Sequence, residues 1–440
     1  MRARAIRTAV VGATAIAALG AAVLTAPVAG ATGSAGGPAR AAGHTATQAA
    51  MDAQVSDAGV PGVLAQARDG RGVWNGDAGV ADLRTGAPRG ENDRYRVGSI
   101  TKTFTATVML QLRAEGKVDL DAPVETYLPD LVRGNGHDGR RITVRQLLNH
   151  TSGIFNYTAD QEFADTYLGI GFLKHRYETL KPRAAVAIAM RHRPDFAPGT
   201  DWKYSNTNYL LAGLIIEKVT GTPYATQVQR RVIEPLGLRS TTLPGTRAGV
   251  PGPHGRGYTR FPDDPRHTTY DTTRLNPSWG WSAGEIISTN ADINRFYAAL
   301  LQGRLLPRAE LAEMKRTVSV GGNSPARYGL GIAEAPLSCG TKVWGHDGGI
   351  AGSVSYAFSS EDARHQIALN FNGDWSGDGV AVLNAEFCGT SSGTGTGTGT
   401  GSGSGTATGT DSDTGVDAGR GLTPRAPHRA GPSSLISAAG

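Results

Sequence analysis

Segments with a strand pattern lie near both ends of the folded part of this chain, and segments with a helix pattern lie between them. Apolar and polar residues alternate, as in half-buried strands, over 62–67, 79–83, 354–358 and 366–371. Helical periodicity follows Ser99 and recurs over 142–148, 208–219, 225–233 and 291–301. We therefore expect an α+β fold, with one antiparallel sheet built from both chain ends and a helical region contributed by the middle.

The two ends of the 440-residue chain differ in composition from this folded part. Three arginines precede an apolar run over 9–23, and Ala29-Gly30-Ala31 fits a cleavage site. We predict a secretory signal peptide at 1–31, a flexible leader at 32–48 and a folded domain at 49–389. The Gly/Thr/Ser-rich segment 390–440 is predicted to be disordered, because it cannot bury enough apolar surface to offset its chain entropy.

Export agrees with the charge and cysteine content. The apolar run is short and rich in Ala and Gly, so we expect a secreted, extracellular protein without a stable membrane anchor. The net charge is +6, or +3 without the arginines of the signal, and Lys and Arg are scattered, so no nucleic-acid partner is expected. Cys339 and Cys388 favour one disulfide over a catalytic thiol. The histidines show no paired ligand spacing, and neither a metal nor a cofactor is predicted.

Ser99 and Lys102 carry the strongest chemical signal. In a helix their spacing places the hydroxyl and the amine about one turn apart on one face. Tyr204 is a candidate partner, since a nearby ammonium can offset the roughly 4 kcal/mol needed to ionise a phenol near pH 7. Lys102 in its neutral form is the other candidate base, and the sequence leaves both schemes open. Asn206, two residues after Tyr204, is placed to bind a substrate amide.

Two further segments bear on a serine site. His346 and Asp347 precede Gly348 and Gly349, which let a strand edge approach a bound acyl group, so that a backbone N–H there and that of Ser99 form an oxyanion hole. Residues 280–284 fit the G-x-S-x-G elbow around Ser282, with Asp292 and His346 following in order. The elbow needs a buried strand before it, and the proline-containing segment 274–279 does not provide one. We favour Ser99 as the nucleophile.

The chain resembles the serine β-lactamase and penicillin-binding DD-peptidase superfamily and, within it, the class C β-lactamase-like branch. The resemblance covers roughly residues 50–389. It is carried by Arg96-Val97-Gly98-Ser99-Ile100-Thr101-Lys102, Gln146-Leu147-Leu148-Asn149-His150-Thr151-Ser152-Gly153, Phe196-Ala197-Pro198-Gly199, Tyr204-Ser205-Asn206 and Tyr328-Gly329-Leu330-Gly331. It implies a β-lactamase/transpeptidase-like fold and a serine hydrolase domain.

Within this branch, the resemblance is strongest to the secreted D-alanyl-D-alanine carboxypeptidases. It implies that Ser99 is acylated, that Lys102 and Tyr204 transfer protons, and that Asn206 binds the substrate amide. It further implies supporting or substrate-binding roles for Trp279, Arg327, His346, Asp347, Gly348 and Gly349. Arg327 would face the substrate carboxylate, and the Gly349 N–H would join that of Ser99 in the oxyanion hole.

These roles imply a peptidoglycan stem peptide or other small acyl substrate, with β-lactams as covalent inhibitors. At position 347 the carboxypeptidases have a threonine, whereas this chain has Asp347. An acidic side chain there repels a C-terminal carboxylate, which argues against a carboxypeptidase substrate. The sequence therefore keeps an esterase, a β-lactamase and a D-amino-acid amidase as alternatives to a D-alanyl-D-alanine carboxypeptidase. A non-catalytic peptidoglycan-binding protein is the remaining alternative, and retention of all three motifs argues against it.

Overall fold

The computed structural model describes residues 43–389, and the structural statements below concern these residues. The predicted signal peptide, most of the predicted leader and the predicted tail lie outside the described residues. Helix α1 (Thr45–Ser56) begins inside the segment 32–48, so the last residues of the predicted leader are helical. Thr47 is buried there, and its hydroxyl donates to Glu386 Oε2 at 2.7 Å, which ties the start of α1 to the last helix of the domain.

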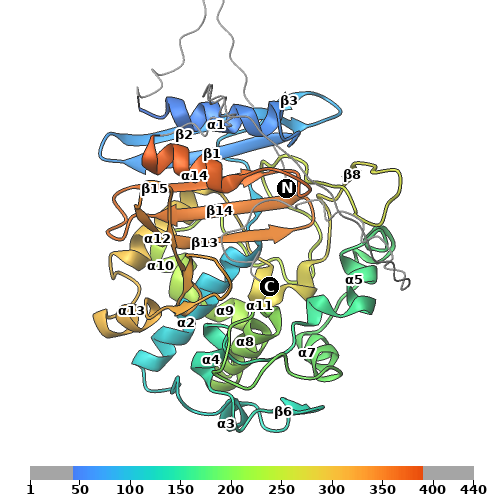
Figure 1. The fold of residues 1–440 in the computed structure, drawn as a ribbon, viewed down its shortest axis with the longest axis vertical. Helices are drawn as coiled ribbons and strands as arrows, with labels where there is room; N and C mark the ends of the chain where they lie inside the picture. The colour runs from blue at the N-terminus through green and yellow to red at the C-terminus, as the bar shows by residue number, and fades with distance from the viewer. Residues whose placement is uncertain (1–42, 390–440) are drawn as a thin grey trace, which may run out of the picture. The chain divides into compact units, whose positions relative to one another are not determined.

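One nine-stranded antiparallel sheet is built from both ends of the chain, as predicted (Figure 1). Its strands, in spatial order, are β10 (Val318–Ser319), β11 (Arg327–Tyr328), β12 (Ala333–Pro336), β13 (Lys342–Ile350), β14 (Ser353–Ser359), β15 (Gln366–Phe371), β1 (Gly62–Asp69), β2 (Gly72–Asp82) and β3 (Ala87–Pro88). The two ends meet where β1 pairs with β15, with Val63 opposite Phe371. The predicted α+β fold class is therefore confirmed.

The two faces of the sheet are covered by different parts of the chain. Alternate residues of a strand point to opposite faces, and in β15 Ile367 and Leu369 join one apolar core while Ala368 joins the other. The first core packs against α1 and α14 (Gly379–Cys388). The second is continuous with the helical region and includes α12 (Asn290–Leu301). A disulfide between Cys339 and Cys388 links the β12–β13 turn to the end of α14, as predicted.

The helical region surrounds α2 (Thr101–Ala114), which is buried on nearly every side. Its neighbours include α8 (Asn206–Thr220), α9 (Tyr224–Val228), α11 (Trp281–Gly284) and α13 (Arg308–Met314), and α4 (Val144–Leu148) packs against α8. The end of α8 at Gly221 was readable from the sequence, because this residue adopts a left-handed conformation (φ 65°) that favours glycine. The predicted helix 225–233 is α9 followed by a π-helical turn over 229–233. None of the described helices is long and apolar enough to cross a membrane.

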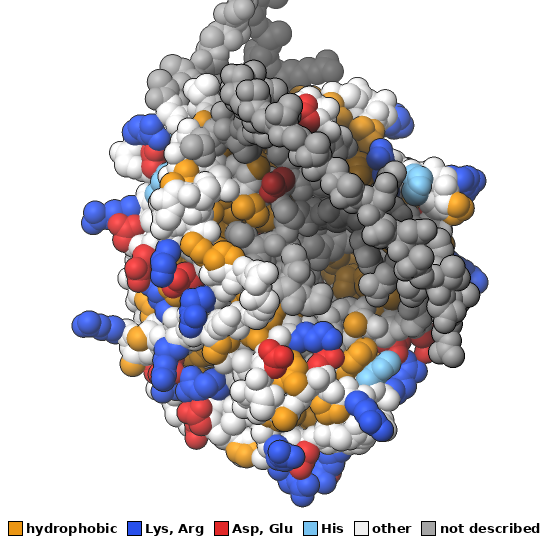
Figure 2. Space-filling view, in the orientation of Figure 1, with side chains coloured by type: hydrophobic (Ala, Val, Ile, Leu, Met, Phe, Trp, Pro, Cys, Tyr) orange, Lys and Arg blue, Asp and Glu red, His pale blue; other side chains and the backbone are white. Residues whose placement is uncertain are grey.

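The remaining elements are short. They are the helices α3 (Val124–Tyr127), α5 (Gln161–Tyr167), α6 (Phe172–His175), α7 (Pro182–Met190) and α10 (Glu234–Leu236), and the strand pairs β4 (Tyr95–Arg96) with β9 (Ile287–Ser288), β5 (Arg133–Gly134) with β6 (His137–Asp138), and β7 (Tyr258–Thr259) with β8 (Tyr270–Asp271). On the described surface visible in Figure 2, Lys and Arg side chains are interspersed with Asp and Glu.

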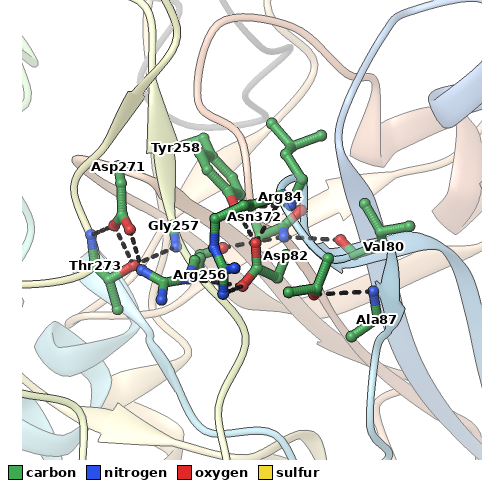
Figure 3. A network of polar contacts seen from close by, with 12 residues as sticks. Val80, Asp82, Arg84, Ala87, Arg256, Gly257, Tyr258, Asp271, Thr273 and Asn372 are labelled. Atoms are coloured by element: carbon green, nitrogen blue, oxygen red, sulfur yellow. Dashed lines mark hydrogen bonds and ion pairs between the residues drawn. The ribbon is translucent and has the colours of Figure 1, made fainter.

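The β7–β8 hairpin is held to the sheet by the polar network of Figure 3. Arg256 pairs with Asp82 of β2 (Nε to Oδ2, 2.9 Å) and with Asp271 of β8. The Asn372 side-chain amide, just after β15, donates to the carbonyls of Val80 (3.0 Å) and Arg256 (3.1 Å). These contacts fix the hairpin beside the ends of β2 and β15.

Candidate active site

Ser99 and Lys102 meet at the start of α2, as their spacing predicts. Ser99 lies in the 3-10 turn Gly98–Ile100 that leads into the helix. The Lys102 Nζ atom lies 2.9 Å from Ser99 Oγ, and it also donates to Asn206 Oδ1 at 2.7 Å and to the carbonyl of Ala283 at 2.8 Å. Lys102 is fully buried, so a nucleophile, an amine and an amide from distant segments share one site.

Strand β13 passes directly against the turn that holds Ser99, and glycines make this approach possible. A Cβ atom at Gly348 would lie 2.1 Å from the carbonyl of Val97 and 2.7 Å from the backbone nitrogen of Ser99. Gly98 has φ +53°, and a Cβ there would lie 2.7 Å from the backbone nitrogen of Gly349. Side chains at these two positions would push β13 away from the nucleophile.

A Gly348→Ala substitution tests this close approach. We expect it to lower the free energy of unfolding by about 1–3 kcal/mol, because the added methyl overlaps backbone that has no room to move. Displacing β13 by about 1 Å should lower the rate of acylation about 100-fold. Urea unfolding and the rate of labelling by a fluorescent penicillin measure the two effects. At Gly349 a Cβ would meet nothing within 4 Å, so a Gly349→Ala protein with the same loss of stability would contradict the steric explanation.

Tyr204 lies next to this pair, as the sequence requires of a proton-transfer partner. The Lys102 Nζ atom is 4.8 Å from the centroid of its ring. Burial raises the pKa of the Tyr204 hydroxyl well above its usual value, and the neighbouring Ser99 hydroxyl opposes the rise. Burial also lowers the pKa of the Lys102 amine well below its usual value, against the opposing charge of Asp347. Both pKa shifts favour a neutral Lys102 amine beside a neutral Tyr204 phenol.

Asn206 begins α8 and joins Lys102 to a loop that the sequence analysis did not single out. Its Nδ2 donates to Thr158 Oγ1 at 3.3 Å, and its backbone N–H donates to Asn156 Oδ1 at 3.0 Å. Asn156 and Thr158 follow the segment 146–153 closely in the chain. Polar side chains just beyond that segment were the available signal for them.

The two polar residues of β13 occupy different environments. His346 is fully buried, its Nε2 lies 2.9 Å from Tyr328 Oη, and burial lowers its pKa to about 3, so the ring is neutral. His346 therefore braces β13 against β11. Asp347 is only 7% exposed, and its Oδ1 lies 3.7 Å from His346 Nδ1. Its position adds a carboxylate to the wall beside the nucleophile.

A cavity of about 360 Å³ opens over Ser99. It is lined by Ser99, Asn156, Thr158, Ala159, Lys203, Tyr204, Asn206, Asp347, Gly348 and Gly349. Trp279 does not line it but lines a second cavity of about 270 Å³, which shares Thr158, Asn206 and Gly349 with the first. Most of the residues predicted for the site are thus brought together around two adjoining cavities.

Arg327 is not brought to either cavity. Its side chain is exposed, and the guanidinium donates to the hydroxyl (2.8 Å) and the carbonyl (2.9 Å) of Thr317. The structure therefore gives no support to the expectation that Arg327 faces a substrate carboxylate. The elbow alternative also fails, because Ser282 is fully buried and its hydroxyl donates to the carbonyl of Tyr209 at 2.9 Å. Within residues 43–389, no group of three or more His, Cys, Asp or Glu side chains is placed to hold a metal ion.

This fold and site define a serine hydrolase of the β-lactamase and penicillin-binding superfamily. A sequence profile described as Beta-lactamase matches residues 47–385, and the chain belongs to this family. It is 56% identical to a D-stereospecific amidohydrolase from Streptomyces sp., with a TM-score of 0.76 over 79% of this chain and 99% of that one. It is 29% identical to the D-amino acid amidase of Ochrobactrum anthropi, with a TM-score of 0.65 over 74% of this chain and 91% of that one.

A curated relative has a different activity in its name. Esterase EstB of Burkholderia gladioli is 35% identical over 189 residues, which are 41% of this chain and 46% of the esterase. The chain thus spans about half the length of that relative. Together, the similarities favour the amidase alternative over the carboxypeptidase that the sequence analysis placed first.

Proposed function

We propose that this protein hydrolyses amides of D-amino acids through an acyl-enzyme on Ser99. The observation that carries the proposal is the Asp347 carboxylate in the wall of the cavity over Ser99. A carboxylate there attracts the α-ammonium of an amino-acid amide and repels the C-terminal carboxylate of a peptidoglycan stem. The similarity to a D-stereospecific amidohydrolase over nearly its full length supports the same substrate class.

The contacts of Lys102 suggest how Ser99 is activated. A neutral amine has two N–H donors and one lone pair. Asn206 Oδ1 and the Ala283 carbonyl accept hydrogen bonds and have no proton to donate, so they occupy the two donors. The lone pair is then directed at Ser99, whose hydroxyl donates to it. Lys102 thereby acts as the general base.

In the proposed reaction, Ser99 Oγ attacks the carbonyl carbon of the amide while Lys102 takes the hydroxyl proton. The backbone N–H groups of Ser99 and Gly349 stabilise the resulting oxyanion. The C–N bond breaks as Tyr204 gives its proton to the leaving nitrogen and receives one from Lys102, and ammonia leaves. Water then attacks the ester, Lys102 takes its proton, and Ser99 Oγ recovers a proton as the D-amino acid departs.

We also propose that residues 1–31 direct export and that the catalytic domain extends from α1 to the end of α14. The disulfide between Cys339 and Cys388 is consistent with an extracytoplasmic location, because such bonds persist in oxidising compartments.

A substrate panel tests the proposed function. We expect kcat/KM to be highest for D-phenylalaninamide, at least about tenfold above L-phenylalaninamide, a peptide ending in D-Ala-D-Ala, a cephalosporin and a short-chain aryl ester. The highest value on the D-Ala-D-Ala peptide would restore the carboxypeptidase assignment. The highest value on the aryl ester or the cephalosporin would assign the protein to those alternatives.

An Asp347→Asn substitution tests the proposed ammonium contact. We expect kcat/KM for D-phenylalaninamide to fall about 10- to 100-fold relative to kcat/KM for its N-acetylated form, which carries no ammonium. The ratio matters because Asp347 also raises the pKa of Lys102, and that effect is common to both substrates. Equal losses on the two substrates would show that Asp347 acts on the base and not on the substrate.

A further inference from the structure

The second cavity combines apolar walls with one buried carboxylate. Its volume is about 270 Å³, and its lining includes Tyr167, Leu168, Phe261, Trp279 and Ile350, which form a largely aromatic and aliphatic surface. Among residues 43–389, Asp374 is the only acidic residue that lines this cavity. An acidic group in such a surface is costly to bury unless it is hydrogen-bonded, so its position calls for a reason.

The carboxylate of Asp374 is held in place by hydrogen bonds from two directions. The Thr259 hydroxyl and the Gly352 backbone N–H both donate to Oδ2, each at 2.8 Å. The backbone N–H groups of Asp374 itself and of Arg260 also stabilise the ionised carboxylate. Because both short bonds are made to Oδ2, Oδ1 is the oxygen that a bound donor would reach. Burial raises the pKa of Asp374 to about 6, and the carboxylate is therefore ionised in mildly alkaline solution.

The segments that line the cavity around Asp374 are held to the sheet by hydrogen bonds and an ion pair. Thr259 belongs to β7 and Phe261 follows it, and the network of Figure 3 ties this hairpin to β2 through Arg256 and Asp82. Asn372, two residues before Asp374, donates to the carbonyl of Arg256 in the same network. A side chain bound in this cavity would meet a carboxylate of fixed position, which favours selection by hydrogen bonding.

We infer that the second cavity binds the side chain of the D-amino acid, and that Asp374 selects aromatic side chains that end in a hydrogen-bond donor. The cavity shares Thr158, Asn206 and Gly349 with the cavity over Ser99, so a substrate held at the nucleophile extends into it. The phenol of D-tyrosine and the indole of D-tryptophan combine an apolar ring with a donor. Both match the apolar surface and its buried carboxylate, and this inference rests on the proposed function.

Kinetics provide the first test. In the native protein we expect kcat/KM for D-tyrosinamide to exceed that for D-phenylalaninamide about tenfold, because only the phenol gives the carboxylate a hydrogen bond. In an Asp374→Asn variant the ratio should fall to about one, while turnover of D-alaninamide, which has no donor in its side chain, should change less than about twofold. Asp362→Asn, at an exposed side chain in the β14–β15 turn, is the matched control and should keep the native ratio.

Binding without turnover separates this inference from the proposed function. In a Ser99→Ala background, calorimetric titration with D-tyrosinamide and D-phenylalaninamide should show about tenfold tighter binding of the former, and Asp374→Asn should remove the difference. If the binding difference is present but neither amide is hydrolysed by the native protein, the proposed function fails and the subsite stands. If both amides are hydrolysed and bound without preference, the subsite fails and the proposed function stands. A native ratio near one overturns the inference even if Asp374→Asn does not fold.

Discussion

A Ser99→Ala variant is expected to form no covalent adduct with benzylpenicillin and to lose on the order of 10⁴-fold or more in kcat toward every acyl substrate that the native protein hydrolyses. The reason is geometric. Ser99 Oγ lies 2.9 Å from the buried amine of Lys102 at the floor of the cavity, and the substitution removes the only atom in that position that can form an ester. Intact-mass analysis after incubation with penicillin, followed by peptide mapping, measures the adduct directly.

The matched control for this experiment is Ser282→Ala. Ser282 is the nucleophile of the rejected elbow alternative, and its hydroxyl donates a hydrogen bond to the carbonyl of Tyr209. We expect the Ser282→Ala protein to keep the penicillin adduct and to lose about 1 kcal/mol in the free energy of unfolding, the typical value of a buried hydrogen bond. An adduct that persists in Ser99→Ala and disappears in Ser282→Ala would reverse the assignment of the nucleophile.

A Lys102→Met variant is expected to be acylated about 10²- to 10⁴-fold more slowly than the native protein, because it lacks the base that takes the Ser99 proton. Methionine has a similar length and no charge, so the buried position remains filled. Stopped-flow labelling with a fluorescent penicillin measures the rate. A loss of less than about tenfold, together with a large loss in Tyr204→Phe, would make the tyrosine the base.

The same variant has a second expected effect, on the pH dependence of stability. Burial lowers the pKa of Lys102 in the folded protein, whereas the unfolded chain keeps a value near 10.5. Between the lowered folded pKa and the unfolded value, the unfolded state binds more protons than the folded state, so in this window the group makes the free energy of unfolding rise with pH. We expect the native protein to gain up to about 1.4 kcal/mol per pH unit more than Lys102→Met over this window. Urea unfolding at several pH values checks the difference, and parallel curves would show that Lys102 keeps its ordinary pKa.

The main elements of the fold were predictable because their signals are local. Alternation over 366–371 and a glycine after α8 each report a conformation that the neighbouring residues themselves favour. Helix α1 was not predicted, since the buried face of Thr45–Ser56 carries only small and polar residues and one methionine instead of an apolar stripe, and this face packs on β1, β2 and α14. The strand edge expected at Gly348 and Gly349 is β13, although its run His346-Asp347-Gly348-Gly349 has the composition of a turn. It is extended because β12 and β14 pair with it on both sides.

The candidate site divides in the same way. The amino-acid sequence alone determined which chemical groups are present and that Ser99 and Lys102 face each other, because a spacing of three residues at a helix start is a local property. Only the tertiary structure decided that Tyr204, Asn206 and Asp347 lie beside that pair. It also decided that Arg327 lies outside both cavities and that a second cavity forms around Asp374. The physical reason is that distances between remote segments, and the burial that shifts the pKa values of Lys102 and Tyr204, depend on how the sheet packs against the helical region.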